Sequence, residues 1–176
     1  MGFAGRPNGV RESLRRSNIL FSRTGRYALQ AMSCMAKHPL GYPLKIEEVS
    51  WAGQIPSAYL AKIFQGLVRA GLLTSRRGPR GGYVLKKDPS TVSLLDIINA
   101  TDSMEHSPLT HCVVGLGRCQ NTNPCNLHTL WTQTTRKIKE RLEKTSLKEF
   151  SGATIPFRSG TKTRRILSPQ IRGIFH

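Results

Sequence analysis

Acidic residues are scarce in this chain. Ten Asp and Glu stand against 27 Lys and Arg in 176 residues, which gives a formal net charge of +17 at pH 7. Such a surplus favours polyanionic partners, nucleic acid before an anionic membrane surface, and it exceeds what solubility requires. The sequence also lacks a Ser-His-Asp-like grouping and a phosphate-binding glycine-rich loop. We therefore expect a binding protein and not an enzyme.

Long apolar runs are also missing. No segment has the roughly 20 apolar residues that a spanning helix needs, so we expect no membrane partner. Residues 1–20 carry arginines and no apolar core of signal-peptide length, which indicates a cytoplasmic, nucleoid-associated protein and argues against structural disulfides. Aromatic residues make up only 7% of the chain. An RNA-binding protein remains an alternative, but it would need exposed aromatics among its basic residues for base stacking.

Cysteine is limited to four residues, and three of them gather in one segment. Cys112, Cys119 and Cys125 are followed by His128, so three thiols and an imidazole fall within seventeen positions. Thiolates and an imidazole at this spacing can enclose one metal centre, and the intervening Gly, Asn and Pro residues supply turns. The segment therefore predicts a metal or cluster site. Zinc accepts the same ligands as iron, and a disulfide with a spare thiol is the weaker alternative. Cys34 lies far away in the sequence, and we interpret it as a small buried hydrophobe.

The segment after the basic N-terminus predicts a helix-turn-helix unit. Ser22 or Thr24 can cap a first helix whose apolar stripe extends to Met35. A second helix is predicted over 46–52 and a third over 56–70. A solvated helix face is the simpler interpretation of the third helix. Its polar residues can also reach phosphates or base edges in a major groove; they are Ser57, Tyr59, Lys62, Gln65 and Arg69.

A basic hairpin is predicted next, with strands over 72–74 and 83–85. Its glycines, Gly81 among them, let the backbone approach a phosphate or enter a minor groove. A helix-turn-helix followed by a basic hairpin describes a winged helix; the alternative is a turn whose arginines only face water. The basic residues that precede the next acid are Arg76, Arg77, Arg80, Lys86 and Lys87.

The expected fold is mainly α with a small β-hairpin wing. A capping-box pattern at Ser93 and Asp96 predicts a further helix to about residue 100. The apolar stripe that begins at Leu127 must pack on a partner or on its own core. We favour a two-fold homodimer, with packing inside the monomer as the alternative. The predicted segments are a disordered basic extension over 1–20, a winged helix-turn-helix over 21–101, a cysteine-rich loop over 102–126, a dimerisation helix over 127–150 and a disordered basic tail over 151–176.

These elements, in this order, resemble the Rrf-two family of bacterial winged-helix regulators, in particular its IscR, NsrR and RirA branch. The resemblance covers about 21–150. It rests on Thr24-Gly25-Arg26-Tyr27-Ala28-Leu29, on Tyr59-Leu60 with Phe64, Leu67, Arg69, Ala70, Gly71 and Leu72, on Arg77-Gly78-Pro79-Arg80-Gly81-Gly82-Tyr83, and on the three-cysteine loop.

The resemblance implies a homodimeric transcription factor whose iron-sulfur cluster tunes its affinity for operator DNA. The segment from Cys125 to Trp131 looks like the IscR type, in which a His three positions after the last Cys completes a 2Fe-2S site. The alternative resembles the nitric-oxide-sensing branch, in which a 4Fe-4S site can take an acidic ligand from the first helix of the partner subunit. In this chain that region has no Asp or Glu but Arg26, which we place among the DNA-binding residues. A regulator that senses cluster status, iron, nitric oxide or redox state is therefore expected. The alternative is a zinc-stabilised or cluster-free DNA-binding regulator.

Three departures from the IscR pattern bear on its details. Six residues separate Cys112 from Cys119, one more than is usual. Ala58 and Ala61 stand where IscR-like proteins have hydrogen-bonding side chains, and Arg80 replaces a glycine of the wing. We therefore expect a different operator sequence.

Overall fold

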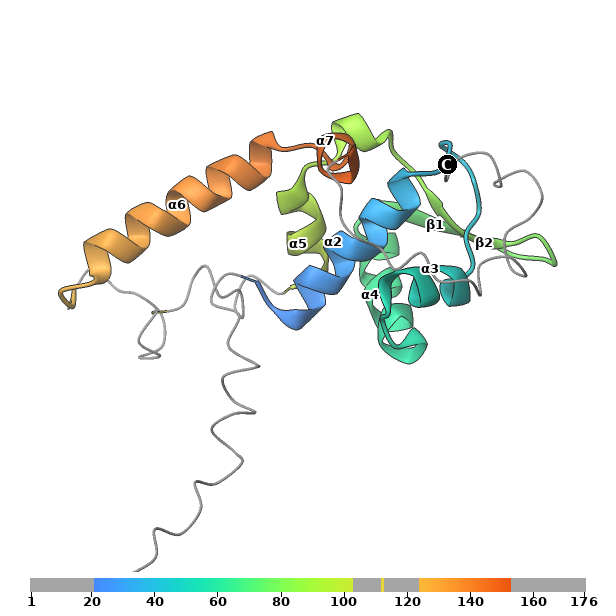
Figure 1. Ribbon diagram of the computed structural model, residues 1–176, viewed down its shortest axis with the longest axis horizontal. Coiled ribbons are helices and arrows are strands. Elements are labelled where there is room, and N and C mark those ends of the chain that lie inside the picture. The colour runs from blue at the N-terminus through green and yellow to red at the C-terminus, as the bar shows by residue number, and fades with distance from the viewer. Residues whose placement is uncertain (1–20, 103–111, 113–123, 153–176) are drawn as a thin grey trace, which may run out of the picture.

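The structure is a computed structural model that describes residues 21–102, 112 and 124–152. Mainly α architecture with one two-stranded antiparallel sheet is found in these residues (Figure 1), which confirms the expected fold class. The extension over 1–20 and nearly all of the tail over 151–176 lie outside them, as does most of the cysteine-rich loop. The elements are α2 (Arg23–Ala36), α3 (Ile46–Gly53), α4 (Ser57–Arg69), β1 (Leu73–Arg76), β2 (Gly82–Leu85), the 3-10 helix η1 (Pro89–Thr91), α5 (Leu94–Thr101), α6 (His128–Lys144) and α7 (Leu147–Gly152).

Two helices begin at the serines that the sequence indicated. The backbone N–H of Gly25 donates to Ser22 Oγ at 2.9 Å at the start of α2. At the start of α5, Asp96 N–H donates to Ser93 Oγ at 3.0 Å, and Ser93 N–H donates to the Asp96 carboxylate at 3.1 Å. Each bond satisfies an N–H group that the helix itself leaves unpaired.

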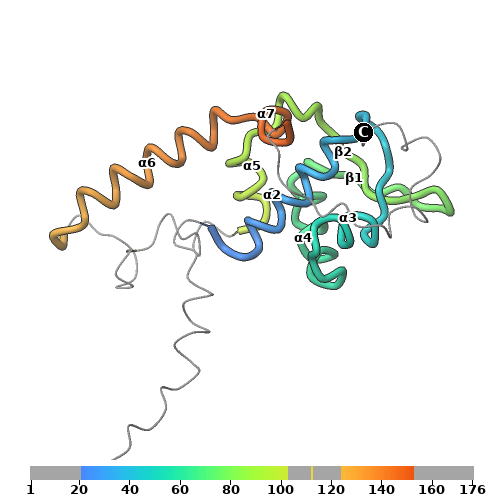
Figure 2. Tube along the Cα trace, in the orientation of Figure 1, coloured from blue at the N-terminus to red at the C-terminus, as the bar shows by residue number. Residues whose placement is uncertain are grey.

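Helix α2 lies at the centre of the body, with α5 on one side and α3 and α4 on the other (Figure 2). Its Ala28, Met32 and Met35 are buried, and they join Phe64 of α4 and Ile97 of α5 in one apolar cluster. Burial of large side chains of this kind contributes about 1.5–3 kcal/mol each. The helix-turn-helix of α3 and α4 is therefore fixed through α2.

Helices α4 and α5 cross closely at Gly66. A Cβ atom at this position would lie 2.9 Å from the carbonyl oxygen of Ala100. Only a residue without a side chain lets the two backbones approach this closely, so Gly66 sets the distance between the helix-turn-helix and α5.

The hairpin is anchored to the body at its base. β1 and β2 pair from Leu73 opposite Leu85 to Arg76 opposite Gly82. Tyr83 exchanges two backbone hydrogen bonds of 2.8 and 2.9 Å with Leu44, which precedes α3. The first strand was predicted to end at 74, and this was wrong: the ladder continues two residues further, so Arg76 belongs to the strand and not to the turn.

The helix predicted over 127–150 is divided into α6 and α7. Thr145 adopts an extended conformation with φ −90° and ψ 119°, and its carbonyl accepts a hydrogen bond from Leu94 N–H at 3.1 Å. Ser146 forms an isolated β-bridge with Ser93. The chain therefore leaves the helix in order to bond to the start of α5.

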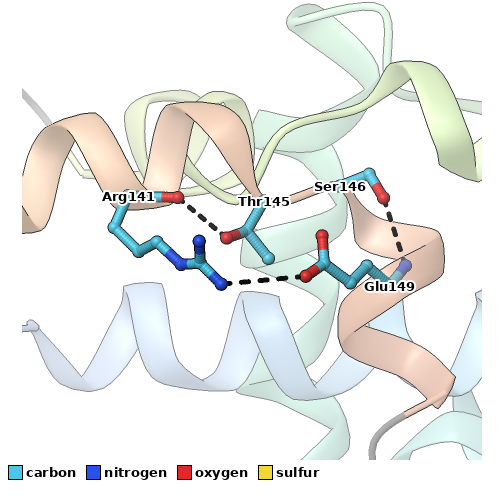
Figure 3. A network of polar contacts seen from close by, with 4 residues as sticks. All are labelled: Arg141, Thr145, Ser146 and Glu149. Atoms are coloured by element: carbon cyan, nitrogen blue, oxygen red, sulfur yellow. Dashed lines mark hydrogen bonds and ion pairs between the residues drawn. The ribbon is translucent and has the colours of Figure 1, made fainter.

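Polar contacts hold this corner (Figure 3). The Thr145 hydroxyl donates to the Arg141 carbonyl at 2.8 Å, and Glu149 N–H donates to Ser146 Oγ at 3.1 Å. The guanidinium of Arg141 lies 3.9 Å from the Glu149 carboxylate, but both groups are exposed and the pair adds little stability. Ser146 and Glu149 have the Ser-x-x-Glu spacing of a helix start, which was the signal for this break in the sequence.

Asp102, the residue after α5, is linked to the start of α2. Its Oδ1 accepts a hydrogen bond of 2.5 Å from Ser22 Oγ. Its Oδ2 is buried and has no hydrogen-bond partner among the described residues, and a Cβ at Gly25 would lie 3.0 Å from it. Burial raises the pKa of the Asp102 carboxyl, and the bond from Ser22 opposes this only in part. This contact joins residues 80 positions apart, and no sequence pattern indicated it.

No helix in the described ranges combines the length and the apolar character required to span a membrane.

The close crossing at Gly66 predicts that alanine destabilises the protein at this position but not at Gly152. Gly66→Ala should lower the free energy of unfolding, because an overpacking cost of about 1–3 kcal/mol exceeds the roughly 1 kcal/mol that alanine gains in a helix. Gly152→Ala is the matched control, since a Cβ there meets nothing within 4 Å. Urea denaturation measures both; equal stability of Gly66→Ala and the wild type would contradict the close crossing.

The half-buried Asp102 predicts a pH-dependent effect on stability. Because its folded-state pKa is raised, its contribution to the free energy of unfolding is largest below its ordinary pKa of 3.8 and is lost as the pH rises through the raised pKa. Asp102→Asn keeps an acceptor for Ser22 without the charge, so it should gain stability relative to the wild type from pH 4 to pH 7. Glu143→Gln, an exposed change on α6, is the control. Thermal unfolding at each pH measures the difference, and a difference that is the same at both pH values would refute the assignment.

Candidate nucleic-acid interface and metal site

The surface formed by α4 and the hairpin has positive charge and no acidic residue. No Asp or Glu occurs between Glu48 and Asp88. All seven Lys and Arg of this segment are exposed, and none forms an ion pair with a described residue. Exposed cations without acidic neighbours in the sequence favour a polyanionic partner. They are Lys62, Arg69, Arg76, Arg77, Arg80, Lys86 and Lys87.

The N-terminal half of helix α4 has one exposed face. Ser57 and Lys62 are exposed, as the sequence predicted for a helix that contacts DNA bases, and we call α4 the reading helix. Ala58 is exposed beside them. The short Ala58 side chain leaves room above the helix but offers no hydrogen bond. The polar side chains that could meet a base edge on this face are therefore few.

Tyr59 is half-buried and held against α2. Its hydroxyl lies 2.6 Å from the Thr24 hydroxyl, and its ring meets the Tyr27 ring edge-on with the centroids 5.7 Å apart. Arg26, which lies between Thr24 and Tyr27 in the sequence of α2, is half-buried. Tyr59 thus fixes the start of α4 to the start of α2. The sequence placed Tyr59 on a polar helix face and did not indicate this positioning role.

The tip of the hairpin owes its shape to glycines. Gly78 has φ +109°, a conformation that other residues rarely adopt. Gly81 N–H donates to the Gly78 carbonyl at 2.9 Å, and a Cβ at Gly81 would lie 2.3 Å from the Arg76 carbonyl oxygen. The tight turn leaves Arg77 and Arg80 exposed at the end of the hairpin, which is the arrangement expected of a basic wing.

The predicted metal ligands fall only partly within the described residues. Cys112 is half-buried, Cys125 is exposed and His128 is half-buried at the first position of α6; Cys119 lies outside the described ranges. His128 N–H donates to the Cys125 carbonyl at 2.9 Å, so one turn of chain joins these two residues. Among the residues that the structure describes, no three His, Cys, Asp or Glu side chains gather as metal ligands. The four-ligand site stays a prediction.

Cys34 differs from these cysteines in its environment. It lies on α2 among core residues, and burial raises the pKa of its thiol to about 11. A thiol held in its protonated form is a poor metal ligand and a poor nucleophile. This agrees with its interpretation as a packing residue.

Known relatives share this combination of elements. A family model described as Rrf2, iron-dependent transcriptional regulator, matches residues 21–152. The HTH-type transcriptional regulator IscR of Yersinia pestis is 38% identical over 126 residues, which cover 72% of this chain and 75% of that protein. The IscR of Vibrio vulnificus is also 38% identical over 126 residues, which cover 72% of this chain and 73% of that protein.

Solved structures show the same fold. CymR (YrzC), described as the global cysteine regulator of B. subtilis, superposes with a TM-score of 0.64 at 27% identity and covers 77% of this chain and 98% of that one. T. potens IscR gives a TM-score of 0.57 at 25% identity over 73% and 83% of the two chains. The chain belongs to the Rrf2 family and is a DNA-binding transcriptional regulator of the IscR type, not an enzyme.

Proposed function

We propose that the protein is a homodimeric, sequence-specific regulator whose affinity for operator DNA depends on an iron-sulfur cluster. The observation that carries the proposal is the position of the Cys/His donors. They lie between α5, whose end is linked to α2 by Asp102, and α6, whose first residue is His128. A cluster bound to this segment would restrain the end of α5 and, through Asp102, the start of α2, which contacts the reading helix α4.

DNA recognition is assigned to two elements. Ser57, Tyr59 and Lys62 of α4 face a major groove, and Arg77 at the tip of the hairpin enters the adjacent minor groove. The exposed, unpaired cations of this surface support this assignment. Phosphate contacts come from Arg26 at the start of α2 and from Arg76 and Arg80 in the hairpin, where Gly81 lets the backbone approach the phosphate.

The dimer is assigned to α6. This helix extends away from the body, and its N-terminal end lies farthest from it (Figure 1). Leu142 near the other end is buried against the body, whereas Leu127 and Leu130 are 46% and 65% exposed. Large apolar side chains exposed on adjacent turns favour a second copy of the chain as their cover. Packing inside the monomer and packing in a homodimer therefore apply to different parts of α6. The C-terminal half packs on the body of its own chain, and we assign the N-terminal half to the dimer.

The donors fit an iron-sulfur cluster. Cys112, Cys119 and Cys125 supply thiolates, and His128, which must be neutral to bind, supplies an imidazole. Both Cys125 and His128 are accessible at the end of α6. A 2Fe-2S cluster at this site would supply a group that responds to oxidation, iron supply and nitric oxide. The similarity to IscR regulators supports iron-sulfur cluster binding.

Regulation then follows from differential binding. The chain can change its DNA affinity only by as much as the cluster favours one arrangement of the segment over another, typically about 1–3 kcal/mol. In the arrangement described here, Ser22 and Asp102 hold the start of the segment against α2.

Cluster binding is tested by the colour and composition of oxygen-free protein. The wild type should contain iron and sulfide and absorb visible light. Cys112→Ala, Cys119→Ala, Cys125→Ala and His128→Ala should lose most of this absorbance, because each removes one ligand. Cys34→Ala, which removes the buried thiol of α2, should keep it. A colourless wild type with stoichiometric zinc would replace the sensor by a zinc-stabilised regulator.

Wing recognition is tested by removing one exposed arginine. Arg77→Ala should weaken specific binding by about 1–3 kcal/mol and leave iron content unchanged. The control is Lys148→Ala, which removes an exposed cation from α7, outside both α6 and the DNA-facing elements. Gel shift or fluorescence anisotropy at fixed salt measures both. Equal losses in the two variants would mean that Arg77 acts only through net charge.

A further inference from the structure

A cavity of about 210 Å³ opens where α2, α4 and α5 meet. Ile63, Gly66 and Ala100 contribute its apolar part, and Thr24, Lys62 and Arg69 its polar part. The close crossing at Gly66 brings α5 down onto α4 at this point. The cavity is therefore built by the packing of three helices, and the positively charged side of α4 borders it.

Two cations of one helix serve this cavity. Lys62 and Arg69 are seven residues apart on α4, which is two helical turns, so they extend from the same side. Both are exposed, and neither forms an ion pair in the described part of the chain. No acidic residue lines the cavity. Asp102, which follows the lining residue Thr101 in the sequence, is not part of the lining, and its Oδ1 accepts a hydrogen bond from Ser22.

The hydroxyl pair adds a hydrogen-bond donor. Thr24 and Tyr59 share one hydrogen bond of 2.6 Å, and both residues line the cavity. Each hydroxyl has one proton, and the shared bond uses only one of the two. The other proton is free to point at an acceptor. Two cations, a hydroxyl donor and no acidic lining suit a tetrahedral anion.

We propose that this cavity is a phosphate-binding site that clamps one phosphate of the DNA backbone beside the reading helix. The inference deepens the proposed function, because Tyr59 and Lys62 belong both to the cavity and to the reading surface. DNA that lies on α4 brings its backbone to the same edge. Arg69 and Thr24 complete the clamp; the sequence placed Arg69 on the polar face of its helix and gave Thr24 only as a possible helix cap.

The test is the salt dependence of DNA binding by the full-length protein. Affinity for a duplex fragment selected by the wild type is measured over a series of KCl concentrations. Arg69→Gln and Lys62→Gln should each reduce the slope of log affinity against log salt by about one, and Arg69→Gln should weaken binding to all sequences alike. Lys148→Gln on α7 removes the same charge away from the cavity and should leave the slope unchanged. Thr24→Val, which removes a hydroxyl but no charge, should weaken binding with little change of slope.

A phosphate titration identifies the source of the anion. Inorganic phosphate is added to DNA-free protein while the amide NMR signals of Thr24, Gly66 and Thr101 are followed. Reduced slopes with unshifted signals support the DNA phosphate. Unchanged slopes with saturable shifts that vanish in Arg69→Gln would overturn that assignment in favour of a free anion. Unchanged slopes without shifts would overturn the site altogether. Iron content is recorded in the same samples. Absence of the cluster would contradict the proposed sensing, whereas the salt slopes and amide shifts would still test the phosphate site.

Discussion

Helix α2 is the constraint on which the rest of the structure depends. Its buried Ala28, Met32 and Met35 contact the apolar cluster shared by α4 and α5. Its first turn holds Tyr59 of the reading helix through Thr24, and Asp102 at the end of α5 through Ser22. The start of α2 therefore joins the DNA-facing element to the segment that leads to the cysteines. A mechanical link between sensing and binding needs such a shared element, with two arrangements that each partner can favour.

The helices could be predicted from the sequence because their signals are local. Ser22 and Ser93 cap the helices that they were expected to cap, and the basic hairpin follows the third predicted helix. The similarity to Rrf2 regulators confirms the family suggested by these strings. The division at Thr145 was not predicted, although the apolar stripe stops at Leu142 and Ser146 and Glu149 have the spacing of a helix start. What ends the helix is pairing with Ser93 and Leu94, and this pairing exists only in the folded chain.

The candidate site was predictable only in its components. Charge and spacing indicated Arg77 at a hairpin tip and His128 at a helix start, and both lie there. The bond from Ser22 to Asp102 and the cavity beside Arg69 could not be predicted, because they depend on how three helices cross. Gly66 is the residue that determines this crossing, and its importance lies in the side chain it lacks.

We propose that binding of a cluster by the cysteine segment changes the affinity of the protein for operator DNA. The most direct measurement compares operator affinity of one oxygen-free preparation before and after removal of its cluster, at one salt concentration. The account predicts a change of about 5- to 150-fold, and a smaller one for Ser22→Ala, in which the bond to Asp102 is absent. Equal affinity of the two forms, with iron and sulfide verified in the first, would contradict the claim and leave a regulator that binds DNA without sensing through this segment.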